Sequence, residues 1–131
     1  MLTTPQHATL KLLHIDDEPR VRQLVRDLIE DDLEVTCEFC EGQCGRDAES
    51  LYQQHQPDIV LMDFEMEDGN GLSATRDLLA RFPKARVVFL TLHDLPDVRQ
   101  AAATAGATAF LSKSDIADLP ELLLSLTNPT S

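Results

Sequence analysis

The sequence has no tryptophan, only three cysteines and no long apolar run, and its basic residues are few beside its acidic ones. An odd number of cysteines argues against a secreted disulfide framework, so we expect a cytoplasmic protein. None of the apolar stretches approaches the length of a membrane span. The formal net charge of −12 argues against direct contact with nucleic acid or an anionic membrane, because both require clustered lysine and arginine.

The length and composition are those of one ordinary globular domain. The chain has 131 residues, of which 43% are hydrophobic and 26% are charged. We expect the folded domain at residues 9–127, a disordered segment at 1–8 and a frayed tail at 128–131.

Apolar runs of strand length alternate with segments of helical periodicity along the chain. Strands are expected at Thr9–Ile15, Glu34–Phe39, Asp58–Met62, Arg86–Leu90 and Ala107–Ser112. The helices between them are expected to turn apolar residues inward, among them Val21, Leu24, Val25, Leu28 and Ile29 in the first and Leu72, Leu78, Leu79 and Phe82 in the third. This alternation predicts an α/β doubly wound parallel sheet with right-handed crossovers and helices on both faces.

Four of the apolar runs end in a polar residue suited to handling a phosphoryl group. These residues are Asp16 with Asp17, then Asp63, Thr91 and Lys113. They are separated by about two, one and one strand–helix units, so a parallel sheet would place them along one edge, where open α/β sheets bind ligands.

The chemistry of these residues is complementary. Adjacent acids form an oxygen-rich site for a hard cation, for which Mg²⁺ is the best candidate. Lys113 supplies a positive charge for a phosphate oxygen and Thr91 a hydroxyl donor, while Asp63 can act as a carboxylate nucleophile. The predicted chemistry is phosphoryl transfer to Asp63.

The motifs that carry this pattern are four: His14–Pro19 (HIDDEP), Leu61–Met66 (LMDFEM), Leu90-Thr91 and Gly106–Lys113 (GATAFLSK). With them the chain resembles a response-regulator receiver domain of two-component signalling, most of all the subfamily whose output is a helix-turn-helix DNA-binding domain. The resemblance implies a flavodoxin-like (βα)5 fold with the strand order 2-1-3-4-5.

The resemblance also assigns roles at the metal site. It implies that Asp63 is the phosphoacceptor and that Asp16 and Asp17 hold Mg²⁺ with it. The backbone carbonyl of Glu65 would be a further ligand of the metal.

Five residues would control switching or the lifetime of the phosphoryl group. Thr91 resembles the switch hydroxyl, Phe110 the switch aromatic, and Lys113 the lysine that pairs with the phosphoryl group. Glu65 and His93 lie two residues beyond Asp63 and Thr91, so we hypothesise that they flank the attacking water during hydrolysis. The sequence departs from the family pattern at two places where proline is common, Glu67 and Ser114.

The expected function is that of a phosphorylation-controlled signalling receiver. A sensor histidine kinase or histidine phosphotransferase would donate the phosphoryl group, and a partner-binding face would switch, to control a DNA-binding domain outside this sequence. The chain would catalyse only its own phosphoryl transfer and dephosphorylation, and a second copy is a candidate partner. The alternatives are a stand-alone adaptor receiver, a small-molecule aspartyl phosphohydrolase and a constitutive interaction module.

The cysteines form a C-x₂-C-x₃-C pattern that invites a metal interpretation. A separation of three residues within a strand would place Cys37 and Cys40 on opposite faces, and no fourth ligand lies near Cys44. We therefore expect free cysteines that behave as small hydrophobic residues.

Overall fold

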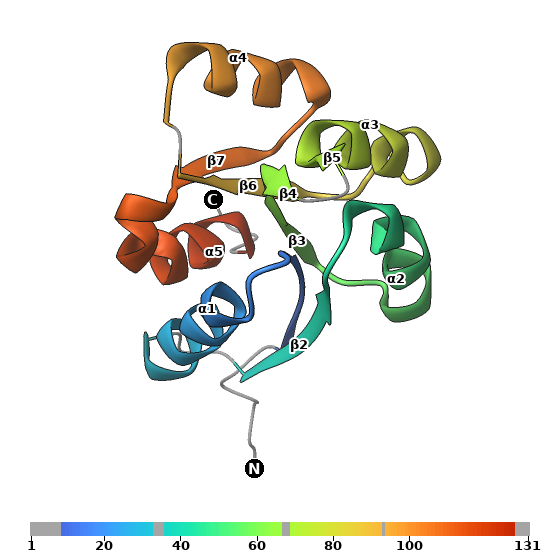
Figure 1. The fold of residues 1–131 in the computed structure, drawn as a ribbon. Coiled ribbons are helices and arrows are strands. Elements are labelled where there is room, and N and C mark those ends of the chain that lie inside the picture. Colours follow the sequence, from blue (N-terminus) through green and yellow to red (C-terminus); the bar gives the residue numbers. More distant parts are fainter. Residues whose placement is uncertain (1–8, 33–35, 67–68, 93, 128–131) are drawn as a thin grey trace.

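The computed structural model describes residues 9–32, 36–66, 69–92 and 94–127, and it shows one parallel sheet between two layers of helices (Figure 1). The strand order is β2-β1-β3-β6-β7, and all four neighbouring pairs run parallel. This order confirms the predicted doubly wound fold. The strands are β1 (Thr9–Ile15), β2 (Thr36–Gly42), β3 (Ile59–Asp63), β6 (Val87–Thr91) and β7 (Ala109–Ser112).

Helices follow each strand of the sheet and cover both of its faces. In Figure 1, α1 and α5 lie together on one side of the sheet, and α2 and α3 lie on the other. Two 3₁₀ segments, η1 (Gly45–Asp47) and η2 (Lys113–Asp118), lead into α2 and α5. The helices are α1 (Pro19–Asp32), α2 (Ala48–His55), α3 (Gly71–Arg81), α4 (Pro96–Ala105) and α5 (Leu119–Thr127).

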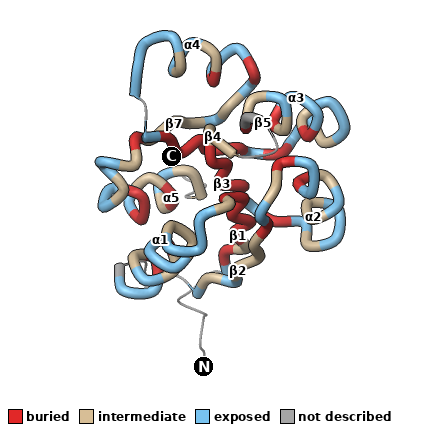
Figure 2. Tube along the Cα trace, viewed as in Figure 1, coloured by how far each residue is buried: buried red, intermediate tan, exposed pale blue. Residues whose placement is uncertain are grey.

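The core consists of two apolar clusters separated by the sheet. Leu12 of β1 packs in the cluster beneath α1 and α5, whereas its neighbour Leu13 packs in the cluster on the α2 and α3 side, because successive strand residues face opposite ways. Figure 2 shows the buried residues concentrated on the strands. Both β3 and β6 are buried along their whole length, as central parallel strands should be.

The two faces of the sheet also separate the cysteines. Cys37 packs against the α1 and α5 cluster and Cys40 against the other, which confirms the prediction from their spacing. Both thiols and that of Cys44 are free. Burial, with the nearby Glu30 carboxylate, raises the pKa of the Cys37 thiol to about 12, so this thiol is protonated and behaves as an apolar side chain.

Two local predictions were wrong and one element was missed. The second strand runs on to Gly42, beyond its predicted end at Phe39, and the predicted first residues Glu34 and Val35 lie outside the described residues. This strand lies at the edge of the sheet, where a half-exposed strand carries a weak apolar pattern. Leu24 is 43% exposed, since it lies about 120° around α1 from the midpoint of the buried Val25 and Ile29. A short antiparallel pair, β4 (Glu65–Met66) with β5 (Gly69–Asn70), was not predicted.

The predicted disordered segment at 1–8 and the predicted tail at 128–131 lie outside the described residues.

Over the described part of the chain, no helix combines the length and the apolar character needed to cross a membrane.

Candidate functional site

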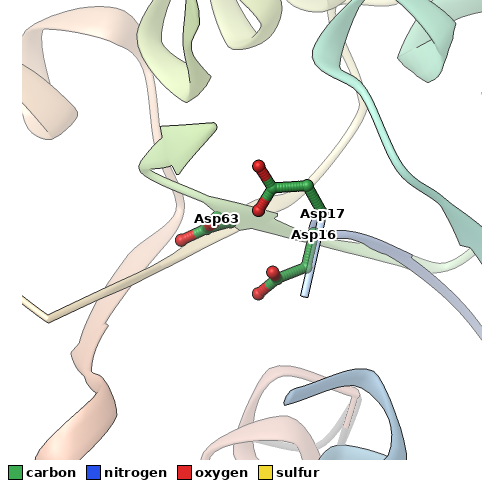
Figure 3. Close-up of side chains that lie close together, drawn as sticks. All are labelled: Asp16, Asp17 and Asp63. Atoms are coloured by element: carbon green, nitrogen blue, oxygen red, sulfur yellow. The ribbon is translucent and has the colours of Figure 1, made fainter. Parts of the chain in front are cut away.

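Three carboxylates meet at the carboxyl edge of the sheet. Figure 3 shows Asp16 and Asp17 at the end of β1 beside Asp63 at the end of β3. One ligand oxygen from each residue lies within 4.8 Å of the other two. Asp16 and Asp63 are buried and Asp17 is half-buried. The topology has brought together residues that the sequence separates by two strand–helix units.

Lys113 joins this cluster from the neighbouring end of β7. Its Nζ lies 2.9 Å from Asp63 Oδ1 and 3.4 Å from Asp16 Oδ2. The turn that carries it is fixed by Ser112, whose Oγ accepts a hydrogen bond from the Ser114 backbone N–H at 3.2 Å. Ser114 therefore holds the lysine turn in a position where proline, which lacks an N–H, could not do so.

Burial and crowding set the protonation of the acids. Burial raises the pKa of Asp63 to about 6, with the charges of Asp16 and Glu65 adding to this rise and Lys113 opposing it. The pKa of Asp16 is also raised by burial, against the hydrogen bond from the Glu18 N–H and the charge of Lys113. Burial acts to lower the pKa of Lys113, but the hydrogen bond to Asp63 and the charge of Asp16 outweigh it, so that pKa is raised. A cation is the natural partner for such a cluster.

The loop after β1 is held by polar contacts of Asp16. Its Oδ1 accepts the Glu18 N–H at 2.8 Å, and its carbonyl oxygen accepts a hydrogen bond from Arg22 Nη1. The imidazole of His14 is buried beside Asp16. Its pKa is lowered to about 3, first by burial and then by the charges of Lys113 and Arg22. The imidazole is therefore neutral at neutral pH, and its approach of 3.8 Å to Asp16 Oδ2 is not an ion pair.

Thr91 and Glu65 form a second set of contacts at the same edge. Thr91 ends β6 and is fully buried, and its hydroxyl donates a hydrogen bond to Glu65 Oε2 at 2.8 Å. Glu65 stands in β4, two residues beyond Asp63. The sequence predicts a role for each residue but not this contact, because no local pattern links residues that are 26 positions apart.

Gly71 is a site residue that no motif of the sequence singles out. A Cβ at this position would lie 2.4 Å from the backbone oxygen of Asp63 and 2.9 Å from Met62 Cγ. Its N–H donates a hydrogen bond to the Phe64 carbonyl at 2.9 Å. The first residue of α3 therefore packs directly on the backbone of Asp63, and only glycine permits that approach.

The sequence matches a known protein family over most of its length. The model of the response regulator receiver domain matches residues 12–124. The chain belongs to the response regulator receiver domain family.

Relatives of this receiver domain include transcriptional regulators and chemotaxis proteins. It is 33% identical over 111 residues to the transcriptional regulatory protein DegU of Brevibacillus brevis, covering 83% of this chain and 46% of that protein. It is 32% identical over 110 residues to the chemotaxis protein CheY of Listeria monocytogenes, covering 83% of this chain and 90% of that protein. The chain thus spans about half the length of the first of these relatives.

A solved structure shows the same fold. The two-component response regulator of the LuxR family from Aurantimonas superposes with a TM-score of 0.83 at 31% identity, covering 91% of this chain and 85% of that chain. The likeness confirms the predicted flavodoxin-like fold of the receiver domain.

Phe110, the predicted switch aromatic of the receiver, lies beside Arg99 of α4. Phe110 of β7 is half-buried, and the Arg99 guanidinium carbon lies 4.8 Å from the centroid of its ring. Arg99 also binds Asp94 through two hydrogen bonds of 2.6 and 3.0 Å, which the sequence analysis had not predicted. His93 lies outside the described residues, so its predicted role stays a prediction.

Proposed function

We propose that this receiver domain accepts a phosphoryl group on Asp63 from a sensor histidine kinase or histidine phosphotransferase, and that the modification switches a partner-binding face. The observation that carries the proposal is the Lys113 ammonium 2.9 Å from a buried Asp63 carboxylate, with two further carboxylates beside it. A purely structural ion pair would not require Asp16 and Asp17 in the same place, since clustered acids repel one another.

The donor atoms of this cluster fit Mg²⁺. Carboxylate oxygens of Asp16, Asp17 and Asp63 stand close enough to share one ion, and Mg²⁺ takes few protein carboxylates. The carbonyl of Glu65 is our candidate for a further ligand. Bound there, the metal would neutralise negative charge on the phosphoryl oxygens.

The chain's own residues would then act as follows. An Asp63 carboxylate oxygen forms a bond to phosphorus while the phosphorus–nitrogen bond of the donor phosphohistidine breaks. The electron pair of that bond stays on the donor imidazole, which takes up a proton. Lys113 holds Asp63 in place and offers its charge to a phosphoryl oxygen, and Thr91 offers its hydroxyl. Glu65 and His93 remain our candidates for setting the rate of hydrolysis.

The output of this receiver would be a binding event and not substrate turnover. We propose that β6, α4, β7 and α5, with Phe110 among them, form the face that changes. Relatives such as DegU carry the word transcriptional in their names and are about twice as long, which supports control of a DNA-binding domain outside this sequence. The match to CheY over 90% of its length supports the second candidate, a stand-alone adaptor receiver. The cytoplasmic location stays a prediction.

Labelling by a small phosphodonor tests the proposal. The protein is incubated with acetyl phosphate and MgCl₂, and intact mass is measured for wild type, Asp63→Asn and the exposed control Asp77→Asn. We expect one phosphoryl group on wild type and on the control, and none on Asp63→Asn. Labelling of Asp63→Asn at the wild-type level would contradict the proposal, and sustained hydrolysis of phosphate esters would favour an aspartyl phosphohydrolase.

A further inference from the structure

The hydroxyl of Thr91 is already engaged before any phosphoryl group is present. It donates to Glu65 Oε2 at 2.8 Å from a fully buried Thr91, whereas Glu65 is half-buried. A hydroxyl carries one proton and donates to one acceptor at a time. While the bond to Glu65 lasts, the proton of Thr91 cannot serve a phosphoryl oxygen.

We propose that Glu65 is a positioning residue that retains the Thr91 hydroxyl in the resting state, so that a phosphoryl group on Asp63 must displace the Glu65 carboxylate to gain Thr91. This inference rests on the proposed function, because it assigns a regulatory role at the same site.

The competition is between two charged acceptors. Glu65 offers a carboxylate and the modified Asp63 a phosphoryl oxygen, and hydrogen bonds to either kind of anion are of similar strength. The bond from Thr91 to a phosphoryl oxygen therefore stabilises the phosphorylated state only by the amount by which its free energy exceeds that of the bond from Thr91 to Glu65. Glu65 thus shifts the conformational population toward the resting state.

Charge then favours release of Glu65 once Asp63 is modified. The Glu65 carboxylate already acts on Asp63 through space at the same sheet edge. A phosphoryl group carries about −1.5 to −2 charges in serine analogues, so it repels Glu65 more strongly than the unmodified aspartate does. The same event that creates a new acceptor for Thr91 weakens the old one.

The backbone around Glu65 is fixed, so the side chain is the part that can move. Glu65 pairs with Asn70 across β4 and β5, and the Gly71 N–H binds the Phe64 carbonyl at 2.9 Å. The Phe64 N–H in turn binds the carbonyl of Leu90, directly before Thr91, at 2.9 Å. Release of the hydroxyl needs a change of side-chain rotamer at Glu65 without displacement of β4.

Binding of beryllium fluoride with MgCl₂, as a non-covalent mimic of the phosphoryl group, tests the inference. Affinity is measured by titration for wild type, Glu65→Gln and Glu65→Ala, each with Thr91 and with Thr91→Val. Glutamine keeps an acceptor but removes the charge, alanine removes both, and valine removes the donor. Glu18→Gln is the matched control, because it removes one exposed carboxylate near Asp16 and leaves Thr91 untouched.

We expect Glu65→Gln to bind the mimic about threefold tighter than wild type and Glu65→Ala about tenfold tighter, which is about 1.4 kcal/mol. With Thr91→Val, the two Glu65 variants should agree within about twofold, because the competed donor is gone. Glu18→Gln should stay within about twofold of wild type. The Thr91 methyl resonance of unliganded Glu65→Ala should move toward its position in the liganded wild type, which a merely structural role would not produce.

Two outcomes separate the inference from the function on which it rests. Equal affinities of Glu65→Ala and Glu65→Gln in the presence of Thr91, with an unmoved Thr91 methyl resonance, would overturn the retention of Thr91 alone. Failure of wild type to bind the mimic, together with failure of acetyl phosphate to label Asp63, would overturn the proposed function and this inference with it.

Discussion

Replacing Gly71 with alanine should disturb Asp63 without changing any charged or hydroxyl side chain of the site. The new Cβ would lie 2.4 Å from the Asp63 backbone oxygen, 2.9 Å from Met62 Cγ and 3.0 Å from Phe89 Cε1. Met62 and Phe89 are fully buried, so their side chains have little room to move away. The contact with the backbone oxygen can be relieved only by a shift of the backbone, because Asp63 ends a strand that is buried along its whole length.

The size of the effect follows from two opposing contributions to the free energy of unfolding. Overpacking of a closed site costs about 1–3 kcal/mol. Alanine restricts the unfolded chain more than glycine does, which returns about 0.4–1 kcal/mol. We therefore expect Gly71→Ala to lose about 1–2 kcal/mol, measured as a lower urea midpoint with an unchanged m-value.

Labelling of Asp63 by acetyl phosphate distinguishes a local displacement of the Asp63 backbone from a general loss of stability. The matched control is Gly106→Ala at the C-terminal end of α4, where φ is +99° and an alanine is strained by a comparable amount. Both variants should lose stability, but only Gly71→Ala should be labelled more slowly. We expect its phosphorylation rate to fall by about threefold or more, because a displaced Asp63 carboxylate is less well aligned for attack on phosphorus. An unchanged urea midpoint and an unchanged labelling rate in Gly71→Ala would refute the reasoning.

Further predictions concern pH and the α4 side of the domain. The pKa of Asp63 is raised to about 6 in the folded state from 3.8, so the stability due to this group is present below pH 3.8 and is lost as pH rises through 6. Asparagine does not titrate. In urea unfolding without metal, the gain in the free energy of unfolding on Asp63→Asn should therefore grow from pH 4 to pH 7. A stabilisation independent of pH would count against the raised pKa. The pKa of His14 is lowered to about 3 from 6.5, so the contribution of this group to the free energy of unfolding is complete above pH 6.5 and is lost as pH falls toward 3. His14→Leu should therefore lose less stability between pH 7 and 5 than wild type does. Equal losses in the two proteins would contradict this. Replacing Arg99 with alanine removes the contact with the Phe110 ring and both hydrogen bonds to Asp94, so faster Phe110 ring motion is expected by NMR, with Arg81→Ala as a control on another helix.

The positions of the main site residues could be predicted because they depend on topology. Apolar runs that end in Asp16, Asp63, Thr91 and Lys113 mark strand ends, and parallel strands put those ends at one edge whatever the helices between them contain. The contacts of Arg99 could not be predicted in this way. Its partner Phe110 belongs to β7, and only the packing of α4 against β7 brings the two within reach. Its other partner, Asp94, lies in the loop before α4, whose course no sequence pattern determines.

The same distinction explains why the contact of Glu65 with Thr91 and the role of Gly71 were not predicted. A sequence pattern reports which face of a strand or helix a residue occupies, but the Thr91–Glu65 bond depends on how far β4 carries a side chain beyond the end of β3. Gly71 resembled any turn glycine, although what requires it is the oxygen of Asp63 beneath it. The Thr91–Glu65 bond positions a hydroxyl, and the close approach of Gly71 positions the backbone of Asp63. Neither Glu65 nor Gly71 itself supplies a group that would bind a phosphoryl oxygen. Sequence spacing therefore predicts the groups that would touch a phosphoryl group, whereas the groups that hold them ready are determined by tertiary packing and must be seen in the structure.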